Sequence, residues 1–277
     1  MSLRIATNIA AINGQRQLFT TNNNMMRSLE RLSSGFRINR AADDAAGLAI
    51  SENLRAQIRG LKQANRNAND GVSMVQIAEG GLNEIGNMLI RMRELAIQAA
   101  SDTVGDRERG FTDSEFQQLK NEIQRVSEVT EFNGKPLLNG VGGIFDLQVG
   151  VHNNPFNDRI SFDTSSADST LMGLGVINEN VSSKAAAQGT LSVIDDAITK
   201  VSGIRANFGA LQNRLISTIN NLNISHENLS AANSRIRDTD MAEESAELAK
   251  HNILMQSGTS VLGQANQIQS IALKLLS

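Results

Sequence analysis

The sequence has no cysteine, tryptophan or tyrosine and only two prolines among its 277 residues. Because cysteine is absent, a disulfide, a thiolate metal site and a cysteine nucleophile are all excluded within these residues. Aromatic residues make up only 3% of the sequence, so the bulky side chains that usually fill a thick core are scarce. This composition favours long, thin helices that pack through small and aliphatic side chains.

Strong charge and long apolar runs are also missing. The formal net charge is -3 with both signs mixed, which gives no basic face for a nucleic-acid partner. No apolar run approaches the length of a membrane span, and the first residues, MSLRIATNIAAINGQRQLF, are interrupted throughout by Asn, Arg and Gln. We therefore expect no nucleic-acid partner, no membrane insertion and no cleavable secretory signal.

No set of residues converges on a catalytic, cofactor or metal site. His152, His226 and His251 are widely separated and lack the spacing of metal ligands. Asp43 and Asp44 are adjacent, so on a helix they point to different faces and do not form a catalytic pair. Because no serine or threonine lies in a nucleophile motif either, we expect a protein that is not an enzyme and binds no cofactor.

Helical periodicity dominates the two halves of the chain. Pro136 and Pro155 both lie in the middle, so the flanking segments contain no obligatory helix breaker. We expect a long helix over residues 42–100, a shorter one over 113–130 and a third over 184–232. Small or apolar residues recur every seven positions in both long helices, as in coiled coils: Leu54, Leu61, Ala68, Val75, Leu82, Leu89 and Ala96, and then Ile194, Val201, Phe208, Leu215, Leu222 and Leu229.

The two ends of the chain carry matching apolar series at seven-residue spacing. Their opposite charges, basic in the first segment and acidic at the start of the last, favour antiparallel pairing of the ends. Two helices alone bury too little surface, so we expect neighbouring copies to complete the burial in an open helical filament. The series are Ile5, Ile12, Phe19 and Met26; Leu18, Met25 and Leu32; Met241, Leu248, Met255 and Leu262; and Leu254, Val261, Ile268 and Leu275.

The centre of the chain has a different pattern. Apolar and polar residues alternate over residues 145–150 and again over 159–163, with the turn-forming run Asn153, Asn154 and Pro155 between them. This alternation predicts a β-hairpin within about residues 140–165. The expected fold class is therefore mainly α: a long antiparallel coiled-coil helical rod with a small central β-hairpin region, plus paired N- and C-terminal helices.

The segment SSGFRINRAADDAAGLAIS, residues 33–51, joins two of the expected helices. Gly35 allows a backbone conformation that breaks a helix, and Asp43 and Asp44 suit the first turn of the helix that follows. The physical argument supports a helix–turn–helix joint here, with Gly35, Arg37, Asp43 and Asp44 as its characteristic residues.

Several long motifs, in order, resemble those of bacterial flagellins. They are SLERLSSGFRINRAADDAAGLAISENLRAQIRGL (residues 28–61), ANDGVSMVQIAEGGLNEI (68–85), LIRMRELAIQAA (89–100), EFNGKPLL (131–138), SRIRDTDMAEESAELAK (234–250) and QSGTSVLGQANQ (256–267). The resemblance covers nearly the whole chain, and the short centre implies a flagellin without large outer domains.

The resemblance implies a domain arrangement and a role. Residues 1–33 and 233–277 would form the two halves of the filament-core domain, and residues 34–46 the linker. Residues 42–183, with the hairpin, and the helix 184–232 would form the rod. The implied function is a structural subunit that self-assembles into the extracellular bacterial flagellar filament used for swimming. We expect the core seams to include Ile5, Ile12, Phe19, Met26, Leu248, Met255, Leu262, Ile268 and Leu275.

The resemblance also implies partners. They are other flagellin copies, a dedicated export chaperone that grips the C-terminal arm, and cap and junction proteins, with type III export of the chain. LIRMRELAIQ resembles the segment that host Toll-like receptors recognise in flagellins, and by position Arg91, Leu95, Gln98 and Glu115 match that footprint. The alternative role of these residues is packing between rods in the filament.

Two other functions are compatible with the pattern. A hook–filament junction protein shares the end segments and the assembly logic, but it is expected to depart from flagellin through the middle of the chain. A soluble coiled-coil binding module would form a stable monomer or dimer with ordered ends.

Overall fold

The computed structural model describes the backbone of residues 7–274 and the side chains of residues 7–267. The chain divides into two compact units. The terminal unit comprises residues 1–56 with 228–277, and the central unit comprises residues 57–227. Each unit is built mainly from long helices, which confirms the expected fold class.

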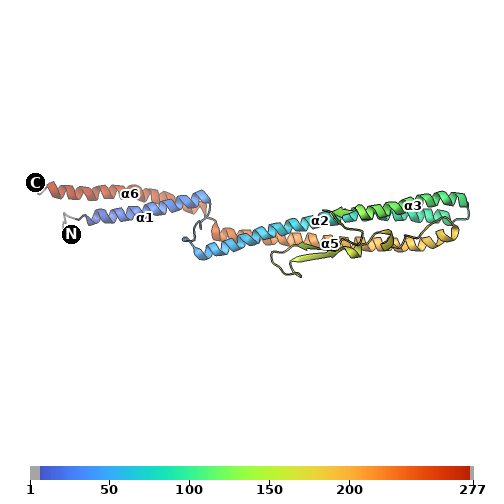
Figure 1. Ribbon diagram of the computed structural model, residues 1–277. Helices are drawn as coiled ribbons and strands as arrows, with labels where there is room; N and C mark the ends of the chain where they lie inside the picture. The colour runs from blue at the N-terminus through green and yellow to red at the C-terminus, as the bar shows by residue number, and fades with distance from the viewer. Residues whose placement is uncertain (1–6, 275–277) are drawn as a thin grey trace. The chain divides into compact units, whose positions relative to one another are not determined.

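The terminal unit pairs the two ends of the chain. Helix α1 (Ile9–Ser34) and helix α6 (Met241–Lys274) lie side by side in Figure 1. They run antiparallel, because the Asn8 side-chain amide donates to the Ala265 carbonyl at 3.1 Å and Arg31 lies 3.5 Å from Glu244. The predicted antiparallel pairing of the ends is therefore present in the structure.

The central unit is a helical rod (Figure 1) formed by most of α2 (Ala45–Ala100), by α3 (Asp106–Val129) and by most of α5 (Lys184–Arg237). Helix α3 runs back along α2, since Arg109 donates to the Ala99 and Ser101 carbonyls at 2.9 Å. The seven-residue series supplies the core, whose fully buried members include Leu82, Leu89 and Ala96 on α2 and Ile194, Phe208 and Leu215 on α5.

Two small antiparallel hairpins lie between α3 and α5. Strand β1 (Glu131–Phe132) pairs with β2 (Lys135–Pro136) across Asn133 and Gly134, which both have positive φ, as a tight hairpin turn requires. Strand β3 (Ile144–Gln148) pairs with β4 (Arg159–Asp163), with Leu147 opposite Ile160. A 3-10 turn (Thr164–Ala167) and the short helix α4 (Leu171–Leu174) lead to α5.

Glycine on α2 lets the β3–β4 hairpin lie close to the rod. A Cβ atom at Gly71 would come 2.6 Å from Leu147, and one at Gly60 would come 2.8 Å from Val151. Between these two points the Asn67 side-chain amide donates to the Gln148 carbonyl at 2.9 Å. The hairpin is therefore docked along α2 by two glycine notches and a hydrogen bond.

Some boundaries differ from the sequence expectation. Helix α3 begins at Asp106 rather than near residue 113, since Gly110 is accommodated within the helix. Helix α5 continues to Arg237, and the β1–β2 hairpin was not expected. Within the described residues, no helix is both long enough and apolar enough to cross a membrane.

Candidate assembly surfaces

The seam between α1 and α6 matches large side chains with glycine. Leu262 lies 3.5 Å from the position of a Cβ on Gly14, and Leu18 lies 2.7 Å from that of a Cβ on Gly258. Continuing this antiparallel register by steps of three and four residues places Thr21 opposite Met255. The seam therefore alternates a large side chain from one helix with a small one from the other.

A second apolar stripe runs along the outer side of α1. Ile12, Phe19 and Met26 are 52%, 68% and 59% exposed. They are separated from the seam residues around the helix, because Leu18 and Met25 of the other seven-residue series are half-buried. The outer stripe of α1 is defined here as Ile12, Phe19 and Met26.

Helix α6 is divided in the same way. Leu248, Met255 and Leu262 are half-buried, whereas Leu254 and Val261 of the second series are exposed. Of the other expected core residues, Ile5 and Leu275 lie outside the described residues, and Ile268 lies in α6 but its side chain is also outside them. Apart from Met241, which is 52% exposed, the described members of one apolar series of each end helix are half-buried within the chain, and those of the other series are exposed.

Polar groups interrupt the seam near the start of α6. Glu244 is buried and pairs with Arg31 at 3.5 Å, and His251 Nε2 lies 3.6 Å from Glu247. Ser28 is buried as well, and a cleft of about 480 Å³ opens between these side chains. Because buried polar groups contribute less than apolar ones, this part of the pair gains little from hydrophobic burial.

The joint after α1 is fixed by hydrogen bonds to the end of α5. Gly35 has φ of 75° and its amide donates to the Arg31 carbonyl at 2.8 Å, which ends α1 as a left-handed cap. Arg37 then donates its backbone amide to the Arg237 carbonyl at 2.7 Å and its guanidinium to the Ile236 carbonyl at 2.8 Å. Gly35 and Arg37, both expected linker residues, therefore hold this turn in place.

Asp43 and Asp44 precede α2 instead of lying in its first turn, which corrects the expectation. Asp44 accepts a hydrogen bond from the Gly47 amide at 2.8 Å, the geometry of an N-cap. Asp43 accepts from the Arg40 amide at 3.0 Å and the Asn39 amide at 3.3 Å. The hydrogen bond from the Arg40 amide is the main cause that lowers the pKa of Asp43 below its usual value.

An exposed ion pair joins α2 and α3 on the rod. Arg91 lies 2.9 Å from Glu115 and 2.9 Å from Glu94, and its hydrogen bonds to both carboxylates raise its pKa. Gln98 is exposed, but Leu95 is 2% exposed and belongs to the core. The expected receptor footprint is therefore divided: three polar members lie at the surface, and Leu95 supports the packing of the rod from beneath.

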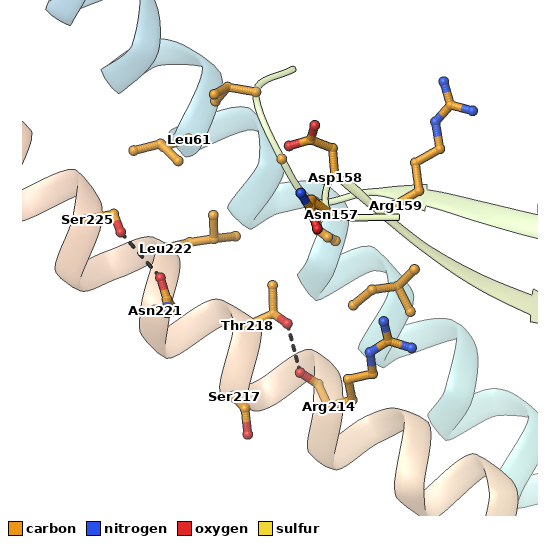
Figure 2. Close-up of a pocket in the computed structure, with 14 residues that line it drawn as sticks. Leu61, Asn157, Asp158, Arg159, Arg214, Ser217, Thr218, Asn221, Leu222 and Ser225 are labelled. Carbon is orange, nitrogen blue, oxygen red and sulfur yellow. Dashed lines mark hydrogen bonds between the residues drawn. The ribbon is translucent and has the colours of Figure 1, made fainter. Parts of the chain in front are cut away.

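A groove between the β3–β4 loop and α5 was not anticipated from the sequence. It has a volume of about 550 Å³ and lies entirely within the central unit. Figure 2 shows Leu61 of α2 and Leu222 of α5 pointing into the space between the helices, with Asp158 on the loop beside them. Only chain segments distant in sequence form this groove, so no local motif signals it.

Ionisable side chains do not gather into a metal site in the described part of the chain. There, no group of three or more His, Asp or Glu side chains is placed to hold a metal ion. His152, His226 and His251 lie on a loop, on α5 and on α6.

The comparisons with known proteins agree across almost the full length. Residues 5–142 match the bacterial flagellin N-terminal helical region, and residues 191–276 match the bacterial flagellin C-terminal helical region. A flagellin of Halalkalibacterium halodurans is 44% identical over 97% of this chain and 98% of its own length. A flagellin of Bacillus subtilis is 41% identical over 99% of this chain and 100% of its own length.

A solved structure gives the same result for the fold. The crystal structure of Bacillus cereus flagellin superposes with a TM-score of 0.51 at 31% identity, covering 57% of this chain and 88% of that one. The flagellin similarity runs through the middle of the chain, where a junction protein was expected to depart. The chain therefore belongs to the bacterial flagellin family and is a structural subunit, not an enzyme, that assembles with other flagellin copies into the extracellular flagellar filament used for motility.

Proposed function

We propose that the outer stripe of α1, Ile12, Phe19 and Met26, is the surface through which copies of this flagellin pack in the filament core. The observation that supports it most directly is the large exposure of these side chains in a pair of helices whose other apolar series is already used. An apolar stripe that recurs every seven residues is suited to a further helix. The exposed Leu254 and Val261 of α6 supply the complementary contact from a neighbour.

The joint at residues 34–46 connects the core segments to the rod in this proposal. Gly35 turns the chain, Arg37 ties the turn to the end of α5, and Asp43 and Asp44 order the residues before α2. Each copy uses one surface toward the copy before it and a different surface toward the copy after it. Such contacts form a ring only when the rotation between successive copies closes, and otherwise they continue as an open helix.

The exposed apolar residues of α1 and α6 also explain the proposed binding of an export chaperone and of the cap and junction proteins. Before assembly, a dedicated export chaperone covers the C-terminal arm, where Leu254 and Val261 are exposed. At the filament ends, cap and junction proteins meet copies whose stripes have no further flagellin to pack against. These partners act on a chain delivered by type III export.

A host Toll-like receptor is a second proposed partner, favoured by the exposed Arg91–Glu115 ion pair on the rod. Arg91, Gln98 and Glu115 form the polar part of that contact, and Leu95 contributes by holding α2 and α3 together beneath it. Within the filament, the primary role of the same ion pair is packing between rods, and a receptor therefore meets it on released monomers.

The central test is a pair of substitutions at Phe19. Phe19→Ser removes an exposed aromatic from the outer stripe, whereas Phe19→Leu keeps an apolar side chain. We expect Phe19→Ser to abolish filaments in seeded polymerisation followed by negative-stain microscopy, and Phe19→Leu to polymerise. Because the side chain is exposed, the free energy of unfolding of both variants, measured on the free chain, should lie within about 0.5 kcal/mol of that of the parent. Normal filaments from Phe19→Ser would remove the stripe from the assembly surface.

A further inference from the structure

The groove of the central unit has an apolar floor. Leu61, Val149, Ile160 and Leu222 line it and are buried. Its volume of about 550 Å³ is within the range of pockets that enclose a small ligand, so an aromatic side chain fits inside. We define the groove by these four residues together with Arg214 on its rim.

Arg214 and Arg159 give the lining of the groove two positive charges against the single negative charge of Asp158. Arg214 lies on α5 and extends toward the hairpin in Figure 2. Within the described residues, its guanidinium forms no ion pair. An anionic group carried by a partner would find an available charge there, although such a rim contact contributes more to orientation than to affinity.

The far end of the same rod carries a side chain of matching chemistry. Phe111 on α3 is 67% exposed. Glu108 lies one turn before it on the same face, is exposed and forms no ion pair within the described part of the chain. Phe111 therefore presents an exposed aromatic group, and Glu108, whose Oε2 folds back toward Gly105, supplies an exposed carboxylate on the same face of α3.

We propose that Phe111 of one copy docks in the groove of the next copy, with Glu108 facing Arg214. The inference rests on the proposed head-to-tail assembly and names the contact that sets its repeat along the rods. Phe111 and the groove lie on different parts of the rod, so the contact is heterologous and continues from copy to copy.

Phe156 is the other strongly exposed aromatic of the central unit, at 89%, but it does not fit this role. It belongs to the loop that also supplies Asn157 and Asp158 to the groove. If Phe156 occupied the groove of another copy, the same patch would face itself and the contact would close as a dimer. A growing filament needs a docking side chain that lies away from the groove, and Phe111 meets this condition.

The distance along the rod makes the contact measurable. Gly71 of α2 faces Leu215, so it marks the level of the neighbouring Arg214 along the rod. Ala99 of α2 accepts a hydrogen bond from Arg109, so it marks the level of the neighbouring Glu108. At a rise of about 1.5 Å per residue, the two charged groups of one chain are separated by about 40 Å. Successive copies joined by this contact are therefore offset by about 40 to 50 Å along parallel rods.

The absence of cysteine permits a direct test by thiol cross-linking of the full chain. The double variant Glu108→Cys with Arg214→Cys is polymerised and treated with a short bis-maleimide linker. We expect a ladder of covalent multimers in denaturing gels from filaments and none from monomers, because the two thiols of one chain are too far apart for the linker. Each single variant, and the matched control Ser192→Cys with Arg214→Cys, should give no ladder.

The outcomes separate this inference from the assembly proposal. Filaments of the double variant that yield no ladder, or dimers only, overturn the docking of Phe111. If the parent chain itself forms no filament with seeds, it is the assembly proposal that fails.

Charge exchange and an aromatic control give a second measurement if the cysteine variant does not polymerise. Glu108→Arg and Arg214→Glu should each raise the critical concentration for polymerisation at least threefold, and their combination should restore it. Phe111→Ser should raise it about tenfold, with the unfolding midpoint unchanged, whereas Phe156→Ser should leave it unchanged. Critical concentrations unaffected by all three single changes overturn the proposal.

Discussion

Single buried polar side chains hold the irregular parts of this chain against its helices. Lys120 is a buried residue, and its ammonium donates to the Ile177 carbonyl at 2.8 Å and the Glu179 carbonyl at 2.9 Å. Burial lowers the pKa of Lys120, opposed by the nearby Asp113 and Glu179 carboxylates. The lysine thereby fastens α3 to the loop that leads into α5.

Lys120→Met should destabilise the central unit. The substitution leaves the partly buried Ile177 and Glu179 carbonyl groups without their charged donor, at a cost of about 1–3 kcal/mol in the free energy of unfolding. Urea unfolding followed by circular dichroism measures the change. Lys62→Met, at an exposed position of α2, is the matched control and should change the same free energy by less than about 0.5 kcal/mol. Equal effects of the two variants would contradict the role of Lys120.

Asp43 should make the joint sensitive to acid. Its pKa is lowered in the folded chain, so its contribution to stability is complete above the ordinary pKa of 3.8 and is lost as pH falls through the lower folded pKa. The amide resonances of Asn39 and Arg40, followed by nuclear magnetic resonance, should therefore shift with a midpoint below ~4. In Asp43→Asn, which keeps an acceptor oxygen, this transition should vanish. A midpoint at or above the usual value would contradict the argument.

At the scale of the helices, size complementarity fixes how α1 and α6 pair. Leu18 fits against Gly258 and Leu262 against Gly14, so a shift of one helix along the other would bring leucine against bulkier residues. The polar seam residues Ser28 and Glu244 add specificity with little hydrophobic gain. The register of this pair therefore depends on Gly14 and Gly258, which lie near opposite ends of the sequence. No local sequence pattern encodes a pairing between such distant residues.

Two glycine substitutions on α6 should act in opposite directions. A Cβ on Gly258 meets Leu18 at 2.7 Å, so Gly258→Ala should push the helices apart and lower the thermal midpoint of filaments. Gly263 has nothing within 4 Å, and Gly263→Ala should stabilise α6 by about 0.5–1 kcal/mol through helix propensity. Differential scanning calorimetry compares the two. Destabilisation by both variants would show that Gly263 is also covered in the filament.

On the scale of the whole molecule, burial is concentrated in one of the two units. The connected apolar core comprises residues between Ala68 and Leu215, all in the central unit. Among the described apolar residues, the terminal unit contributes a buried Ile38 and otherwise half-buried seam residues, and its other buried side chains, such as Ser28 and Glu244, are polar. Local stability follows buried apolar contacts, so the two units should open with different free energies.

Amide hydrogen exchange should therefore differ between the units of the free chain. Segments of α1 and α6 should exchange faster than residues 74–99 of α2, and polymerisation should slow the end helices because their outer stripes become covered. Mass spectrometry of peptides from monomer and filament measures both rates. Residues 74–99 serve as the internal reference, since their core is complete in one chain. Equal protection of α1 in monomer and filament would argue against burial of its outer stripe.

The sequence by itself determined the helical class, the β3–β4 hairpin and the family, because periodicity and long motifs are properties of contiguous residues. It also supplied the two apolar series of each end helix. Only the tertiary structure decided that Leu18 and Leu262 face the seam while Phe19 and Val261 face outward, because this depends on the glycines opposite them.

Other assignments required the fold for the same reason. Asp44 became an N-cap only when the helix start was fixed at Ala45, and Leu95 was found in the core beneath Arg91. The groove joins Leu61, Asp158 and Leu222, three positions brought together by a hairpin docked between two helices. Spacing along the chain determines which residues share a face of one helix, whereas the partner of that face depends on the shape of distant segments.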